Sequence, residues 1–401
     1  MIESGTPAFW RATLALCLGS FLIFCNLYTT QPLLPLFSSD FGVSPLLSSL
    51  SLSVSTLTLG ASLLIYGPLS DALGRTRIMQ VTMGLSVVCG VLLAMAPGFW
   101  FLLVVRALQG VCLGGLPAIA VAYMGDEFER PAMTMAVGFY IAANSLGGIS
   151  GRLISGLVAE HWGWHASFLT VAGLSVACLA AFVRLLPPSR TFTRRPLRLR
   201  HMAADLGGHL VNPTLVPAFL IGGLNFFVFV NQYSFITYRL SAPPYGLSPG
   251  WLGMLFLTYL SGTAGSAISG HILRRFSAPA TMALGIVTLM IGTCVTLGDS
   301  LAVIVLGLLL NAFGFFLTHS TASGWVAQQA GRARASASSI YLLCYYLGAS
   351  VGSFYFAPFW SRGGWPGVVV GSLLVFAVTL GLSFRLRTRH GAGRYAAADA
   401  L

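Results

Sequence analysis

The chain contains no lysine, and charged residues of all kinds make up only 8% of its 401 positions. A soluble protein carries about 25% charged residues, because its surface must be wetted. Hydrophobic residues make up 56% of this chain, so lipid rather than water is the expected solvent for most of it. The composition excludes an ordinary soluble protein and indicates an integral membrane protein.

Further absences narrow the function. The sequence has no G-x-x-x-x-G-K-[ST] loop, which argues against ATP-driven pumping by this chain alone. Its seven cysteines form no C-x-x-C pair, so we expect no metal and no cofactor. No acid falls in the middle of a predicted membrane span, and no nucleophile–base pair stands out. A membrane-embedded enzyme or sensor is therefore only a remote alternative.

Long apolar runs define the fold class. A helix needs about 20 apolar residues to cross a membrane. The sequence predicts an all-α integral membrane protein with twelve spanning helices, at residues 12–37, 46–69, 77–97, 99–123, 132–158, 165–186, 214–238, 250–272, 279–298, 300–325, 335–359 and 365–385.

The 22 arginines give the orientation, within a net charge of +12. If the N-terminus is cytoplasmic, only Arg239 and Arg362 fall in outer loops, and Arg106 and Arg152 lie inside helices. The other eighteen lie on the cytoplasmic side, as the positive-inside rule requires. We therefore expect both termini in the cytoplasm. Because the arginines follow membrane topology, we expect no nucleic-acid partner.

The chain divides near its middle. Residues 187–213 are polar and basic, and landmarks on either side recur at a spacing of 201–204 residues, such as Gly163-Trp164 and Gly364-Trp365. We predict a six-helix bundle at 1–186, a basic cytoplasmic linker at 187–213, and a second six-helix bundle at 214–401 with a short basic tail. Repeats of this kind are typical of transporters that expose a central site alternately to each side.

The stretch from 67 to 77 is the most specific motif. Gly67-Pro68 is expected to end one helix, and Asp71 to cap the next or face its positive N-terminus. The stretch resembles the loop between helices two and three of the major facilitator superfamily, G-x-x-x-D-x-x-G-R-x-[RK]. The resemblance implies a twelve-helix transporter of two pseudo-symmetric bundles. In that superfamily the loop closes the cytoplasmic side of the transporter, and we therefore call it the conformational latch. The matching residues are Gly67, Asp71, Gly74, Arg75 and Arg77.

Two residues of predicted helix four extend the resemblance. Arg106 and Gln109 match the superfamily signature R-x-x-Q-G, which implies proton coupling or substrate contact. Burying an arginine in a helix costs at least ~2.5–3.5 kcal/mol on insertion scales, so it must have partners. The alternative is that Arg106 satisfies backbone carbonyls or neighbouring polar side chains.

His319 is the histidine that lies well inside a predicted span. An imidazole binds and releases protons near neutral pH, so His319 is a third candidate for coupling. The alternative is a hydrogen bond to a neighbouring helix.

Predicted helix five carries small residues at a spacing that lets two backbones approach closely. It resembles the superfamily's antiporter signature G-x-x-x-G-P-x-x-G-G, with Arg152 in place of the proline. We expect Arg152, near the outer end, to extend to water. The residues assigned to helix packing are Gly147, Gly148, Gly151, Arg152 and Gly156.

Amide and aromatic side chains inside the spans form the predicted cavity lining. They fall on or beside helices that, in the superfamily, surround the central cavity, and they suit an amphipathic organic ligand. Interhelical hydrogen bonds are the alternative role. These candidates are Asn26, Tyr28, Gln31, Tyr140, Asn144, Asn231, Tyr233, Asn311, Tyr341 and Tyr345.

Two segments suggest a group within the superfamily. Residues 144–156 and 341–348 resemble the YnfM-type inner-membrane transport proteins, a drug-efflux-like group. The resemblance implies proton-coupled efflux of a small organic molecule across the cell inner membrane. Uptake or exchange of a small neutral or anionic solute is the alternative. The expected partners are a small-molecule substrate, protons and the lipid bilayer, and the expected state is a monomer.

Overall fold

A computed structural model describes residues 1–189, 207–330 and 334–398. Most of the predicted linker and the last three residues of the predicted tail lie outside these ranges. Within them the chain is helical, and its extended pairing is one isolated bridge between Ile2 and Phe128.

The elements of the first half begin close to the predicted spans. They are α1 (Pro7–Tyr28), the 3₁₀ turn η1 (Gln31–Leu33), α2 (Leu34–Phe41), α3 (Pro45–Leu73), α4 (Arg75–Ala94), α5 (Phe99–Leu113), α6 (Gly115–Glu127) and α7 (Arg130–Leu185). Those of the second half are α9 (Val216–Ser241), α10 (Pro249–Met254), the 3₁₀ turn η2 (Leu255–Thr258), α11 (Tyr259–Leu273), α12 (Ala278–Val295), α13 (Leu301–Gln329) and α14 (Arg334–Ala398).

The described residues contain ten helical segments that are long and apolar enough to cross a membrane. The two longest, Arg130–Leu185 and Ala337–Leu386, are each about twice the length one crossing needs. Both break at a glycine with positive φ, Gly163 at 78° and Gly364 at 54°. Splitting them there gives twelve crossings. The breaks also fall at the Gly-Trp pair repeated in each half of the sequence. The predicted fold class is confirmed.

One local prediction was wrong. Gly67-Pro68 does not end α3, which continues through Pro68 to Leu73. A membrane helix tolerates an internal proline when neighbouring groups satisfy the freed carbonyl. The helix ends instead at Gly74, whose φ of 105° is unfavourable for residues with a side chain. Asp71 therefore lies in the last turn of α3 and does not cap α4.

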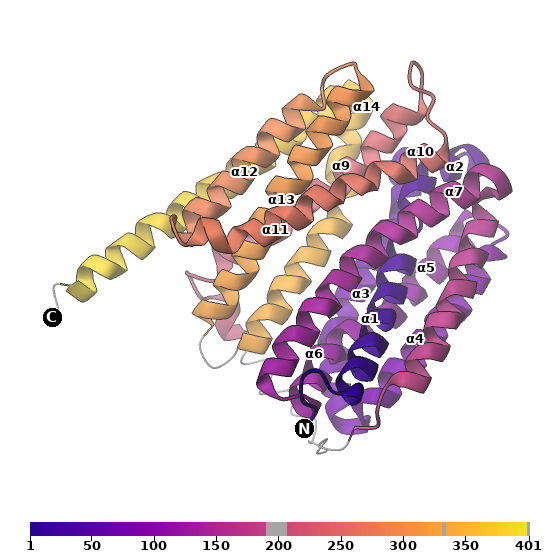
Figure 1. The fold of residues 1–401 in the computed structure, drawn as a ribbon. Helices are drawn as coiled ribbons and strands as arrows, with labels where there is room; N and C mark the ends of the chain where they lie inside the picture. Colours follow the sequence, from indigo (N-terminus) through magenta and orange to yellow (C-terminus); the bar gives the residue numbers. More distant parts are fainter. Residues whose placement is uncertain (190–206, 331–333, 399–401) are drawn as a thin grey trace. The chain divides into compact units, whose positions relative to one another are not determined.

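The chain forms two compact units. The first comprises Met1–Leu199 with Leu240–Phe256, and the second Arg200–Arg239 with Leu257–Leu401. In the first unit α1 packs along α7, α3 packs on α5, and α10 packs on α7 (Figure 1). In the second unit α12 packs on α13 and α14, and α11 packs on α13. The segment 240–256, which begins in the last two residues of α9, thus belongs to the first unit.

Candidate functional site

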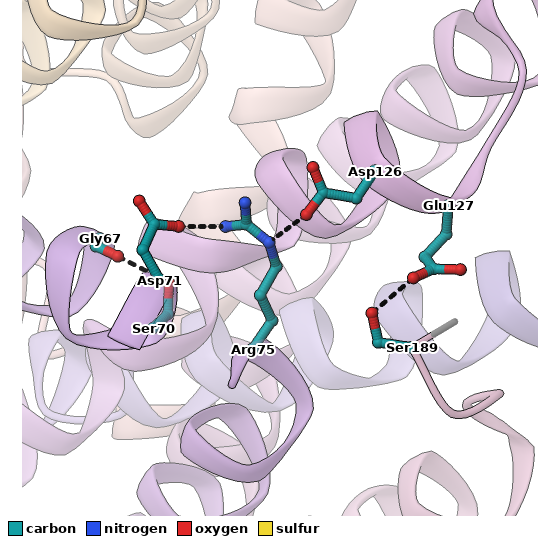
Figure 2. A network of polar contacts seen from close by, with 7 residues as sticks. All are labelled: Gly67, Ser70, Asp71, Arg75, Asp126, Glu127 and Ser189. Carbon is teal, nitrogen blue, oxygen red and sulfur yellow. Dashed lines mark hydrogen bonds and ion pairs between the residues drawn. The ribbon is translucent and has the colours of Figure 1, made fainter. Parts of the chain in front are cut away.

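The latch residues surround the break between α3 and α4. Arg75 begins α4, and its guanidinium lies between two carboxylates, as Figure 2 shows. Arg75 Nη1 is 3.2 Å from Asp71 Oδ1, and Nε donates to Asp126 Oδ2 at 2.5 Å. Gly67 accepts a hydrogen bond from Ser70 through its carbonyl, and Arg77 is exposed. The ion pairs join the ends of α3, α4 and α6.

The end of α6 makes further contacts that sequence reasoning missed. Glu127 accepts a hydrogen bond from Ser189 Oγ at 2.5 Å, as Figure 2 shows. Its backbone carbonyl accepts from the Ile2 N–H at 2.7 Å, and the Glu129 N–H donates to the Ile2 carbonyl at 3.0 Å. Main-chain and side-chain bonds therefore hold the residues that follow Asp126. The sequence signal was the run of three acids between 126 and 129.

Arg106 is completely buried, and three of its hydrogen bonds go to backbone carbonyls. Nη1 donates to the Asn26 carbonyl at 3.1 Å, Nη2 to that of Leu27 at 2.7 Å, and Nε to that of Ser51 at 2.8 Å. Asn26 and Leu27 lie in the last turn of α1, where carbonyls have no donor within the helix. Arg106 therefore caps the negative end of α1.

A side-chain network extends from that cap. Arg106 Nη1 also donates to Gln109 Oε1 at 2.6 Å, and Gln109 Nε2 donates to Asn26 Oδ1 at 3.2 Å. Asn26 Nδ2 in turn donates to Ser175 Oγ at 2.7 Å. The predicted residues Arg106 and Gln109 of α5 are thus joined to Asn26 of α1, and Ser175 extends the network to α7. The predicted roles of Arg106 and Gln109 in coupling or substrate contact, and of Asn26 in cavity lining, stay predictions.

Arg152 does not extend to water, because only 2% of the residue is exposed. Its guanidinium carbon lies 3.8 Å from the ring centre of Tyr28 and 4.6 Å from that of Phe256. Nε donates to Gln31 Oε1 at 2.8 Å, and Nη1 to the Gly148 carbonyl at 2.8 Å. Two aromatic rings and two oxygens replace the water that we expected around this charge.

The glycines of α7 lie against backbone, which supports their packing role. A Cβ at Gly147 or Gly151 would meet the backbone of α1, at Phe21 and Cys25 respectively. A Cβ at Gly156 would meet Pro249 and Gly253, so this glycine lets α10 approach α7. Gly148 is less crowded, with side-chain atoms of Arg152 and Tyr28 at 3.3 Å and beyond.

The remaining candidates of the first unit, Tyr140 and Asn144, both lie on α7. Asn144 Oδ1 accepts a hydrogen bond from Ser20 Oγ, which joins α7 to α1. Tyr140 is buried one turn before Asn144. Among the described residues, no hydrogen bond joins either of them to the Arg106 network.

The second unit holds a network of neutral amides. Asn311 Nδ2 donates to Gln232 Oε1 at 2.8 Å and to Thr293 Oγ1 at 3.0 Å. The two residues that flank Gln232 in α9 are also bonded. Tyr233 Oη lies 2.7 Å from Thr258 Oγ1, and Asn231 Nδ2 donates to the Phe227 and Ala349 carbonyls. Gln232 was not among the predicted residues, and it connects α9 to α12 and α13.

His319 belongs to an aromatic cluster of the same unit. Its Nδ1 is 2.9 Å from Tyr341 Oη, and its ring centre is 4.9 Å from that of Tyr345. Tyr345 stacks on Phe226 at 3.6 Å with the rings 9° from parallel. His319 and Tyr345 are half-buried, whereas Tyr341 is buried. Of the ten predicted cavity residues, Tyr345 and Asn144 are partly exposed and the other eight are buried. Cavity lining stays a prediction.

Comparisons with known proteins match this chain over nearly its whole length. The family model of the Major Facilitator Superfamily matches residues 16–353 of the sequence. The chain is 40% identical over 382 residues to the uncharacterized MFS-type transporter YybF of Bacillus subtilis, covering 95% of each protein. It is 37% identical over 388 residues to the inner membrane transport protein YnfM of Escherichia coli, covering 97% of this chain and 93% of YnfM.

Solved structures share the fold. A bacterial homologue of the human lysosomal transporter Spinster, in an inward-facing and occupied conformation, aligns with a TM-score of 0.73. It is 15% identical, and the alignment covers 96% of this chain and 98% of that one.

Proposed function

We propose, because the chain belongs to the major facilitator superfamily, that it exports a small organic molecule in exchange for protons. The chain is a multi-pass membrane transporter rather than an enzyme. Transport would proceed by alternating access across the inner membrane, with a monomer as the working unit and both termini in the cytoplasm. The similarity to YnfM supports the inner-membrane location. The resemblance of residues 144–156 and 341–348 to a drug-efflux-like group supports export.

The observation that supports proton coupling is the contact between His319 and Tyr341. His319 lies in α13 with Tyr341 Oη 2.9 Å from its Nδ1, and the residue is half-buried. Of the other histidines in the described ranges, those at 161, 165, 209 and 271 lie at helix ends or breaks, and His390 follows the last predicted span. An imidazole inside a span, hydrogen-bonded to a hydroxyl, is suited to take up and release one proton per cycle.

Arg106 and Gln109 would act on transport through the position of α1. The Arg106 cap holds the end of α1, and Gln109 links that cap to the Asn26 side chain. The latch residues would favour the state closed to the cytoplasm, because Arg75 joins α3, α4 and α6 there.

A second candidate is uptake or exchange of a small neutral or anionic solute. The buried guanidiniums of Arg106 and Arg152 favour it, since positive charges inside the first unit disfavour multiply cationic substrates.

Flux into proteoliposomes tests these proposals. The purified chain is reconstituted, and acriflavine, benzoate and uracil are supplied under pH gradients of either sign. Proton-coupled export predicts uphill acriflavine movement that reverses with the gradient and stops when a protonophore collapses it. Uphill benzoate or uracil movement down an inward proton gradient, without acriflavine movement, favours the second candidate. Equal flux of every compound with and without a gradient contradicts proton coupling.

The role of His319 is tested in the same vesicles. His319→Gln keeps hydrogen bonding but cannot titrate, so uphill transport should vanish while downhill exchange persists. His271→Gln, at the exposed end of α11, is the matched control and should behave as wild type. Uphill transport at the wild-type rate in His319→Gln would assign the histidine a purely structural role.

A further inference from the structure

Asn225 is a buried amide with both of its polar atoms unpaired. It lies in α9 and is 1% exposed, and neither its Nδ2 nor its Oδ1 has a hydrogen-bond partner among the described residues. Buried amides are nearly always paired, because an unpaired donor or acceptor loses its bonds to water without replacement. Two turns further along α9, Asn231 shows the usual arrangement. Its Nδ2 donates to the Ala349 carbonyl and its Oδ1 accepts from Ser353.

The register of α9 gives the direction in which Asn225 points. Residues three and four apart lie on one helix face. Gly222 precedes Asn225 by three residues, and a Cβ there would lie 2.7 Å from Tyr341 Oη. Phe229 follows it by four residues and stacks on Phe315 at 4.0 Å. Asn225 therefore faces the region between Tyr341 of α14 and Phe315 of α13.

His319 occupies that same region. Its ring centre is 5.5 Å from that of Tyr341 and 5.8 Å from that of Phe315, and its plane is 15° from the Phe315 plane. His319 and Tyr345 of this cluster are half-buried, whereas Asn225 is buried, so a molecule would reach the amide only if one of these rings moved.

The surroundings define the chemistry of such a molecule. The side chains that the contacts above bring to this face are aromatic rings, the Tyr341 hydroxyl and an imidazole, and none carries a permanent charge. Flat rings stack best on flat rings. A carboxamide presents one donor and one acceptor side by side, and it pairs with an edge that presents the reverse, as asparagine does with a nucleobase.

We propose that Asn225 contacts the transported molecule and that this molecule is an uncharged planar heterocycle with adjacent donor and acceptor atoms, of the nucleobase or lactam type. The assignment rests on transport of a small organic molecule, which both candidate functions share, and it narrows the substrate to an uncharged compound such as uracil rather than a cation such as acriflavine. The unpaired amide lowers the stability of the empty protein, and the substrate edge supplies the missing hydrogen bonds.

Thermal unfolding of the purified chain tests the first half of the proposal without any ligand. Asn225→Leu replaces an unpaired amide with an apolar group of similar size, so Tm should rise by about 2 °C. Asn231→Leu on the same helix removes a paired amide and should lower Tm by about as much or more. A fall of Tm in Asn225→Leu would show that the amide is paired in the folded protein and would overturn the proposal.

Equilibrium binding to the detergent-solubilised chain tests the second half without requiring transport. Adenine and uracil are the probes, and 1,3-dimethyluracil, which keeps the plane but blocks both N–H donors, is the control probe. Wild type should bind adenine or uracil, and should bind 1,3-dimethyluracil about 10- to 100-fold more weakly than uracil. The affinity of Asn225→Leu for adenine or uracil should be lower than that of wild type by a similar factor.

A second variant guards against misfolding. Asn225→Ser can bond a helix carbonyl, and so should fold, but it cannot make the paired contact and should lose the same binding. No binding of adenine or uracil by wild type, or equal binding by wild type and both variants, would overturn the ligand assignment. Because binding needs no proton gradient, such a failure would leave proton-coupled transport of another molecule to be decided by the flux experiment.

Discussion

The two units each use an arginine to cap the end of a helix, but they place it differently. In the first unit Arg106 is fully buried and donates to the last carbonyls of α1. In the second, Arg239 caps α12 through the Thr296 and Gly298 carbonyls with 16% of its side chain exposed. Asp299, 3.9 Å from Arg239, is fully exposed.

The difference shows that helix carbonyls, rather than a carboxylate, balance the buried charge of Arg106. Arg106 receives the negative end of a helix and three carbonyl oxygens in place of a carboxylate. Arg239 needs less compensation, because water reaches it. The first unit should therefore depend strongly on its arginine for stability, and the second unit only weakly.

The largest effect is expected for Arg106→Met. The methionine fills part of the space but leaves the Asn26, Leu27 and Ser51 carbonyls without that donor. Removing one partner of a buried charge network costs about 3–5 kcal/mol in the free energy of unfolding. Thermal unfolding in detergent should show a large fall in Tm, or no folded protein at all.

Arg106→Lys should recover only part of the lost stability, because one ammonium cannot span three carbonyls. A Tm within 2 °C of wild type in Arg106→Met would contradict the cap as a major source of stability (about 2–4 °C corresponds to 1 kcal/mol in a large domain).

Arg106 shows which features of the structure can be predicted from the sequence and which cannot. The twelve crossings were predictable, because apolar runs of about 20 residues and a repeated Gly-Trp pair are visible without a structure. The partners of Arg106 were not, because they are backbone carbonyls, which every residue has. Only the place where α1 ends makes the Asn26 and Leu27 carbonyls available.

Two further residues show the same limit. Arg152 was expected to extend to water, and it is enclosed by Tyr28 and Phe256 instead. Phe256 is one apolar residue among many and gives no sequence signal for this contact. Asn225 could not be distinguished by sequence from the other amides inside the spans, since its special property is that its side chain has no partner among the described residues, and that depends on packing alone.

A smaller effect is expected when the position of α1 is disturbed without touching its cap. A Cβ at Gly151 would lie 2.8 Å from the carbonyl carbon and Cα of Cys25, so α1 and α7 must move apart in Gly151→Ala. Such overpacking costs about 1–3 kcal/mol. Gly138→Ala on the same helix meets nothing within 4 Å and is the matched control, with stability unchanged or slightly raised. Equal unfolding temperatures for the two variants would show that close approach at Gly151 is unimportant.

Arg239→Met tests the other side of the comparison. The guanidinium is partly exposed, and Trp365 Nε1 also donates to the Thr296 carbonyl, so the end of α12 keeps a donor. A charge at a helix C-terminus contributes about 0.3–1 kcal/mol when water can reach it. The expected fall in Tm is therefore well below that of Arg106→Met, and it should shrink further in high salt. A loss as large as that of Arg106→Met would remove the distinction between the two caps.

The smallest effect on stability, with a large effect on transport, is expected for Asp71→Asn. Asp71 and Asp126 are about one-third exposed, and exposed ion pairs contribute about 0–1 kcal/mol. Folding and membrane insertion should therefore survive. The substitution keeps the size of the side chain but removes one of the two carboxylates that hold Arg75, so the latch should form less often. Flux of whichever probe compound the wild type carries should fall to a small fraction of the wild-type rate.

Glu129→Gln removes an exposed acid three residues from Asp126 and is the control, because the described contacts of Glu129 use its backbone. Wild-type flux in Asp71→Asn would mean that Arg75 and Asp126 suffice, and Asp71 would then have no part in the latch.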